Sequence, residues 1–206
     1  MMALYMQREG QMPWPKLRLS AECMTVEDII RRAKCACIVA PGNSFGLMDG
    51  GVDAQIEKAL PGTQECVQAR ILKEYYGELP VGAAVYMTLP AGYQDVVKQG
   101  VVIYAPTMQV PMPIRGTANV YYAMLAVLRT VERNTVFDMP GEIYVPLLGA
   151  GAGGLTVEES MTQMIEALRV YAARDRTAIS WSHARSMHNL WHRMTGVPYD
   201  EEELRG

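Results

Sequence analysis

Residues 36–56 read ACIVAPGNSFGLMDGGVDAQI, and this stretch decides the fold. A short apolar run ends at Pro41, a loop rich in small residues follows, and the segment after Gly50 is typical of a helix. A strand–loop–helix unit offers backbone N–H groups and the positive end of a helix dipole, which suit a phosphate or a pyrophosphate. Asp53 conflicts with this interpretation, because it places a carboxylate where an anion is expected to bind.

The composition is that of a folded α/β domain. The chain has 206 residues, 50% of them hydrophobic, and a formal net charge of −3, so it is long enough for a full core and disfavours bulk nucleic-acid binding. No apolar run approaches the ~20 residues that span a bilayer, and the first ten residues lack a signal-peptide pattern, so we expect no membrane partner. The four cysteines form no C-x-x-C pair, which favours reduced thiols and a cytoplasmic location.

Strand-like and helix-like segments alternate along the chain. This order predicts a three-layer α/β/α sandwich with a mixed, mostly parallel central sheet. The predicted strands span residues 16–21, 35–40, 83–89, 101–105 and 142–146, and Pro106 is expected to end the fourth. The predicted helices span residues 26–33, 50–60, 63–76, 118–133 and 157–173. Residues 1–15 are interpreted as an N-terminal lead-in, 16–178 as the domain, and 179–206 as a helical extension packed on it.

A second glycine-rich segment, LLGAGAGGL at residues 147–155, also lies between a predicted strand and a predicted helix. Two such loops at the carboxyl ends of strands can hold the two ends of one diphosphate. The G-x-G-x-x-G match within it is not a dinucleotide fingerprint, because the required acidic residue at the end of a second strand is absent. The alternative is a tight turn that needs positive φ. Thr156 and Glu159 fit a capping box for the next helix.

The first segment resembles the macro domain, the family that binds ADP-ribose. The family pattern is close to N-A-A-N-x-x-L-x-x-G-G-G-V-D/A-x-x-I, and this chain reads A-P-G-N-S-F-G-L-M-D-G-G-V-D-A-Q-I. The second loop and the apolar strand closed by Pro106 are similar to the corresponding family segments, and the resemblance spans roughly residues 17–173. Asp49 stands where the family usually has its first glycine, and Gly153 where it has an aromatic side chain.

The resemblance implies a role for particular residues. Asn43 matches the asparagine that holds the distal ribose, and Asp53 matches the aspartate that acts with a water in the MacroD-like hydrolase branch. These two are the expected catalytic residues, although Asp53 could instead only charge the first turn of its helix. The expected ligand-binding residues are Ser44, Gly50, Gly51, Val52, Gly149, Ala150, Gly151, Ala152, Gly153, Gly154 and Leu155.

The implied function is binding of ADP-ribose or a derivative, with hydrolysis at the distal ribose of an ADP-ribosylated substrate or of O-acetyl-ADP-ribose. Two alternatives stay open: a module that binds ADP-ribose or a signalling nucleotide without turnover, and an interaction protein with a degenerate pocket. We expect no cofactor and no metal. His188 and His192 share a face of a presumed helix but lack a third ligand of matching spacing. The oligomeric state is left open.

Overall fold

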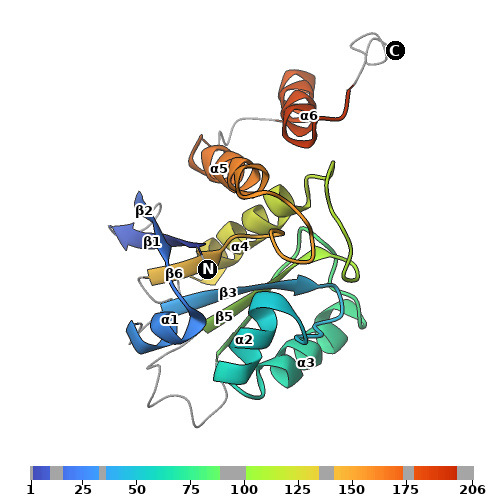
Figure 1. The fold of residues 1–206 in the computed structure, drawn as a ribbon. Coiled ribbons are helices and arrows are strands. Elements are labelled where there is room, and N and C mark those ends of the chain that lie inside the picture. Colours follow the sequence, from blue (N-terminus) through green and yellow to red (C-terminus); the bar gives the residue numbers. More distant parts are fainter. Residues whose placement is uncertain are drawn as a thin grey trace.

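In the part of the chain that the structure describes, six strands form one mixed sheet in the order β2-β1-β6-β3-β5-β4 (Figure 1). The computed structural model describes residues 2–9, 16–32, 36–88, 101–134, 142–173 and 179–198. The strands are β1 (Met2–Glu9), β2 (Lys16–Cys23), β3 (Ala36–Asn43), β4 (Val85–Thr88), β5 (Val101–Met108) and β6 (Glu142–Pro146). The helices are α1 (Val26–Arg32), α2 (Gly51–Ala59), α3 (Thr63–Tyr75), α4 (Asn119–Asn134), α5 (Val157–Ala173) and α6 (Trp181–Thr195).

The centre of the sheet is parallel. Strand β3 pairs in parallel with both β5 and β6, whereas the β1–β2, β1–β6 and β4–β5 pairs are antiparallel. Strands β2, β6, β3 and β5 therefore run in one direction, and β1 and β4 in the other. The predicted mixed sheet is confirmed, with two parallel and three antiparallel pairs among the described strands, and the carboxyl ends of its three central strands meet at one edge, where α/β proteins bind ligands.

Alternate residues of the central strands enter two separate cores. Cys37 and Val39 pack in the core that contains the apolar faces of α4 and α5. Ile38 and Ala40 pack in the core that contains residues of α1, α2 and α3. Because successive side chains of a strand point to opposite faces, a fully apolar β3 requires a helical layer on each side. The three-layer α/β/α architecture is thus confirmed (Figure 1).

Two segments differ from the sequence-based expectation. Residues 2–9 lie in the expected lead-in but form β1, which inserts between β2 and β6. Strand β6 is more than a hundred residues away from β1 in sequence, so no local pattern identifies this pairing. Pro106 does not end β5, which continues to Met108. Pro106 pairs with Gly42 where the β3–β5 register shifts, and a strand tolerates proline at such an irregularity.

The last described helix, α6, lies beyond α5 and away from the sheet (Figure 1). It is joined to the core through the buried Leu190, with Met187, Trp191 and Met194 partly buried against the same cluster. The start of the helix is capped by Ser180, whose side chain accepts a hydrogen bond from the His183 N–H. Within the part of the chain that the structure describes, no helix combines the length and the hydrophobicity that crossing a membrane requires.

Tyr104 determines how β3 ends. Its side chain is fully buried, and its hydroxyl donates a 2.8 Å hydrogen bond to the backbone oxygen of Asn43. The ring lies directly against the backbone of Gly42, because a Cβ atom at that position would stand 2.1 Å from the Tyr104 hydroxyl oxygen. Residue 42 is therefore restricted to glycine by space rather than by its backbone dihedral angles.

We expect Gly42→Ala to lower the free energy of unfolding by about 1–3 kcal/mol, the usual cost of overpacking a rigid interior. Chemical denaturation measures the change. Gly151→Ala is the matched control, because its φ lies outside the left-handed region and an added Cβ would meet no atom within 4 Å; it should change stability by less than about 0.5 kcal/mol. Equal stability of the Gly42→Ala protein and the wild type would contradict this account of Tyr104.

Candidate functional site

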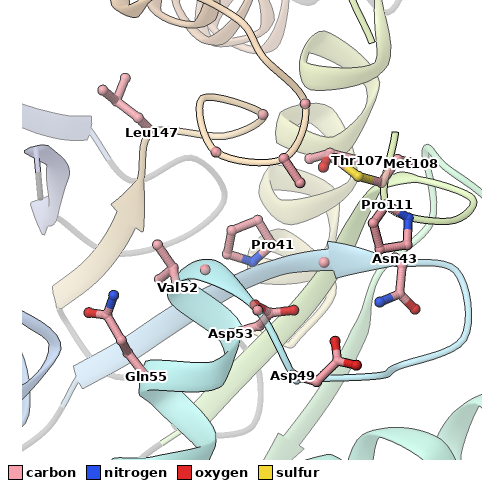
Figure 2. A pocket seen from close by; sticks show the side chains of 17 residues that line it. Pro41, Asn43, Asp49, Val52, Asp53, Gln55, Thr107, Met108, Pro111 and Leu147 are labelled. Carbon is pink, nitrogen blue, oxygen red and sulfur yellow. The ribbon is translucent and has the colours of Figure 1, made fainter. Parts of the chain in front are cut away.

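A cavity of about 270 Å³ opens between the two glycine-rich segments at the carboxyl edge of the central strands (Figure 2). Four parts of the chain line it: the end of β3, the start of α2, the end of β5 with Pro111, and the loop after β6. The parallel pairing of β3 with β5 and β6 brings these parts together, because parallel strands end at the same edge.

The cavity collects most of the residues expected from the sequence. Those that line it are Asn43, Gly50, Gly51, Val52, Asp53, Gly149, Gly151, Ala152 and Gly153. Ser44, Ala150, Gly154 and Leu155 are not among the lining residues. Ser44 is buried beneath the loop, where its N–H donates to Gln109 and its carbonyl oxygen accepts from Leu79. Leu155 is a core residue.

Seven further residues line the cavity that the motifs did not indicate. They are Pro41, Gly42, Gln55, Thr107, Met108, Pro111 and Leu147. Thr107 and Met108 come from the continuation of β5 beyond the expected stop at Pro106. Only the parallel pairing of β3 with β5 could have indicated these two residues, because two adjacent parallel strands place their last residues side by side. Asp49, which had no assigned role, also lines the cavity.

The loop after β6 is held at its C-terminal end. The Arg115 Nε donates a 2.8 Å hydrogen bond to the Gly154 carbonyl oxygen. At the start of α5, Thr156 and Glu159 exchange two hydrogen bonds of 2.7 and 3.1 Å, which confirms the predicted capping box. Gly151 precedes these contacts and lines the cavity, and an added Cβ there would meet nothing within 4 Å. Hydrogen bonds therefore hold the backbone of this loop, while the space next to Gly151 is open to a ligand.

Gly153 cannot be replaced by an aromatic residue in this loop conformation. A Cβ atom at Gly153 would stand 2.4 Å from the Gly149 carbonyl oxygen and 2.9 Å from the Ile114 side chain. The Gly153 carbonyl oxygen also accepts a 2.9 Å hydrogen bond from the Ile114 N–H. The path of the loop backbone thus leaves no room for the aromatic side chain that the family usually has at this position.

Helix α2 begins at the cavity with unshielded backbone donors. Gly50 is its N-cap residue and offers no side-chain cap, whereas the Ala54 N–H of the first turn donates to the Asp53 carboxylate. Gly51 and Val52 follow as the first helical residues and line the cavity. Since the first N–H groups of a helix have no carbonyl partner within it, they are suited to bind an anionic oxygen.

Asp53 is a buried carboxylic acid in the first turn of α2. Only 7% of the residue is exposed, and its Oδ1 accepts a 3.0 Å hydrogen bond from the Ala54 N–H. Burial raises the pKa of Asp53 to about 6, and the nearby charge of Asp49 adds to the shift, although the bond from Ala54 opposes it. Its carboxyl group lies at the same end of the cavity as Asp49 and Asn43 (Figure 2).

The Asn43 side chain shapes the first loop. Its Oδ1 accepts hydrogen bonds from the N–H groups of Phe45 at 3.0 Å and Leu47 at 3.3 Å. Its Nδ2 donates a 2.7 Å hydrogen bond to the Leu47 carbonyl oxygen. The amide keeps one N–H for a ligand, so Asn43 closes the loop and faces the cavity at the same time.

The histidine pair of α6 lies away from this cavity. The Nε2 atoms of His188 and His192 are 3.0 Å apart, and the Nδ1 of His192 is bonded to the Val197 carbonyl oxygen. Across the described ranges, no cluster of three or more histidine, cysteine or acidic side chains is arranged to hold a metal ion. The pair is explained by contacts within the helix and its C-terminal turn.

We expect Asp53→Asn to stabilise the protein above pH 6. A carboxyl group whose folded-state pKa is raised favours the fold while it is protonated and costs stability once the pH exceeds that pKa. Asparagine keeps the acceptor for Ala54 and removes the buried charge, so the variant should gain about 1–3 kcal/mol at pH 8 and nothing below pH 4. Denaturant titrations at both pH values measure this. The exposed Glu158→Gln is the control, and a gain independent of pH would contradict the assignment.

The comparisons with known proteins agree with this geometry. The profile of the macro domain family matches residues 39–164, which include both glycine-rich segments. An uncharacterised protein of Aquifex aeolicus is 32% identical over 146 residues, covering 71% of this chain and 80% of the relative. The macro domain match thus extends over more than half of the chain.

Solved structures share the fold at low sequence identity. The macrodomain of Mycobacterium tuberculosis DarG superposes with a TM-score of 0.53 at 19% identity, over 71% of this chain and 89% of that one. Thermosipho africanus DarTG, solved in complex with ADP-ribose, gives 0.54 at 15% identity, over 68% of this chain and 36% of that one. With the family profile and the three-layer fold in agreement, this chain belongs to the macro domain family.

Proposed function

We propose that this chain binds ADP-ribose or a derivative in the cavity and hydrolyses the bond between the distal ribose and the group attached to it. The observation that carries the proposal is the cavity itself, which has two backbone-lined glycine segments and an acid–amide pair, Asp53 and Asn43, at one end. Membership of the macro domain family supports it, as does the ADP-ribose complex of Thermosipho africanus DarTG.

In this proposal the two glycine segments hold the diphosphate. The first N–H groups of α2 approach it from one side, and the backbone of Gly151 and Ala152 from the other. Among the described residues that line the cavity there is no lysine, arginine or histidine, so the backbone dipoles of the two glycine segments supply the stabilisation.

Asp53 is the proposed general base. As a carboxylate it accepts a proton from a water molecule whose oxygen bonds to the attacked carbon of the distal ribose or of its acyl group, while the bond from that carbon to the leaving group breaks. Asp53 then gives the proton to the leaving group and returns to its carboxylate form. A raised pKa makes the carboxylate more basic and thus better suited to this transfer. The remaining N–H of Asn43 would orient the ribose beside it.

A non-catalytic ADP-ribose module is the second candidate. The observation that favours it is the Asn43 amide, whose oxygen and one N–H are already used by the loop. An asparagine whose side chain is hydrogen-bonded to the loop backbone fits a protein that only binds the ligand as well as it fits an enzyme. Turnover measurements separate the two candidates.

Binding is tested first. Titration calorimetry with ADP-ribose should give a 1:1 complex, and Gly151→Glu should abolish it, because its side chain would enter the open space above the loop and repel the diphosphate. Ala184→Glu adds the same charge on the exposed face of α6 and should leave the affinity unchanged. Unchanged affinity of the Gly151→Glu protein would exclude the second loop from the site.

Turnover is tested with a mono-ADP-ribosylated protein and with O-acetyl-ADP-ribose. We expect Asp53→Asn to bind ADP-ribose but to lower kcat by about 100-fold or more, the usual contribution of a general base. In the wild type, kcat/KM should fall as the pH drops below about 6, because protonated Asp53 cannot accept a proton. A variant as active as the wild type would exclude Asp53 as the general base, whereas a wild type that binds ADP-ribose without turnover would leave only the binding module.

A further inference from the structure

The histidine pair of α6 has the geometry of a chelating site. His188 and His192 are four residues apart, so their side chains are neighbours on one face of the helix. Their Nε2 atoms are 3.0 Å apart, and the ring centroids are separated by 4.5 Å at an interplanar angle of 72°. Both residues are partly exposed, so an ion from solvent can reach the pair.

A backbone carbonyl group orients the second ring of the pair. The Nδ1 atom of His192 lies 2.7 Å from the Val197 carbonyl oxygen. Because a carbonyl oxygen only accepts hydrogen bonds, this Nδ1 carries a proton, and in the neutral ring Nε2 then has a lone pair on the side of His188. Histidine ligands of metal ions are commonly held in this way, with the other ring nitrogen donating to a carbonyl or carboxylate oxygen.

The separation of the two Nε2 atoms fits two adjacent ligands of one metal ion. With a metal–nitrogen bond of about 2.0–2.1 Å, the separation of 3.0 Å corresponds to an N–metal–N angle of about 91–97°. A tetrahedral site would need the two nitrogen atoms about 3.3–3.4 Å apart. An angle near 90° is instead typical of the square-planar and tetragonal complexes of Cu²⁺ and Ni²⁺.

The ligand atoms available on α6 favour the same metals. The helix contains no aspartate or glutamate, so it lacks the carboxylate oxygens that Mg²⁺ and Ca²⁺ prefer. Imidazole nitrogen suits Cu²⁺, Ni²⁺ and Zn²⁺, and Cu²⁺ forms the most stable complexes of the three. Within the residues that the structure describes, no third histidine, cysteine or acidic side chain completes a metal-binding group, so water molecules would take the remaining positions.

We propose that His188 and His192 bind one Cu²⁺ ion per chain through both Nε2 atoms. On binding, the metal replaces the proton between the two Nε2 atoms, and neutral His188 carries its proton on Nδ1 instead. The ion links two successive turns of α6, and the bond from His192 to Val197 connects it to the turn that follows the helix. The site lies away from the cavity, so the inference does not rest on the proposed function.

Titration calorimetry with CuCl₂, in a buffer that does not coordinate copper, tests the site. The wild type should bind one Cu²⁺ per chain. His188→Ala and His192→Ala should each weaken binding by about tenfold or more, because the second ligand of a chelate binds at a high effective concentration. His183→Ala is the matched control, since it removes an exposed histidine from the first turn of the same helix, and it should leave the affinity unchanged. Wild-type affinity in either variant of the pair would overturn the inference.

Spectroscopy distinguishes direct coordination from a structural effect of the substitutions. Trp191 packs against His192 with ring centroids 4.7 Å apart, so the paramagnetic Cu²⁺ should quench its fluorescence. Trp191→Phe should remove this quenching, whereas Trp181→Phe, at the exposed start of the helix, should keep it. The electron paramagnetic resonance spectrum of the wild-type complex should show two nitrogen ligands. A spectrum with oxygen ligands only would overturn the inference.

The choice of metal and the independence from the cavity are tested separately. Zn²⁺ should bind at least about tenfold more weakly than Cu²⁺, and Mg²⁺ should give no heat. Equal affinities for Zn²⁺ and Cu²⁺ would overturn the assignment to copper. If Cu²⁺ does not bind, the inference fails and the proposed function is unaffected; if ADP-ribose does not bind, the proposed function fails and the copper site is unaffected.

Discussion

The contact between Tyr104 and the end of β3 is the constraint on which the site depends. The buried hydroxyl binds the backbone oxygen of Asn43, and the ring occupies the space that any side chain at residue 42 would need. Loss of either feature would move the point at which β3 becomes a loop. Since Asn43 is the last residue of β3 and the loop to α2 follows it, the Tyr104 contact fixes the point from which the chain leads to Asp49 and Asp53.

Asp53 lowers the stability of the fold once it is ionised. The residue is only 7% exposed and lies near a second acid, and both features raise the pKa of its carboxyl group. An uncharged side chain of similar shape would make the folded protein more stable. Retention of the acid is understandable if it handles a proton, and the neighbouring Asp49 then acts on the same chemistry through its field.

Much of this organisation was predictable because it is local. The strand–loop–helix order around Asp53, the capping box of Thr156 and the helix at residues 157–173 follow from short-range patterns of hydrophobicity, glycine and capping residues. The alternation of strands and helices likewise predicts three layers. The errors were non-local. Strand β1 depends on pairing with β6, and the extension of β5 through Pro106 depends on a register shift opposite Gly42.

The sequence by itself determined the fold family and the two glycine segments, since both rest on the spacing of residues within short stretches. Only the tertiary structure decided which residues face the ligand. Ser44 turned inward and Thr107 entered the lining, because hydrogen bonds and strand register between distant segments orient each side chain. The environment of Asp53 was decided in the same way, because burial and a neighbouring charge are properties of the assembled cavity and not of any motif.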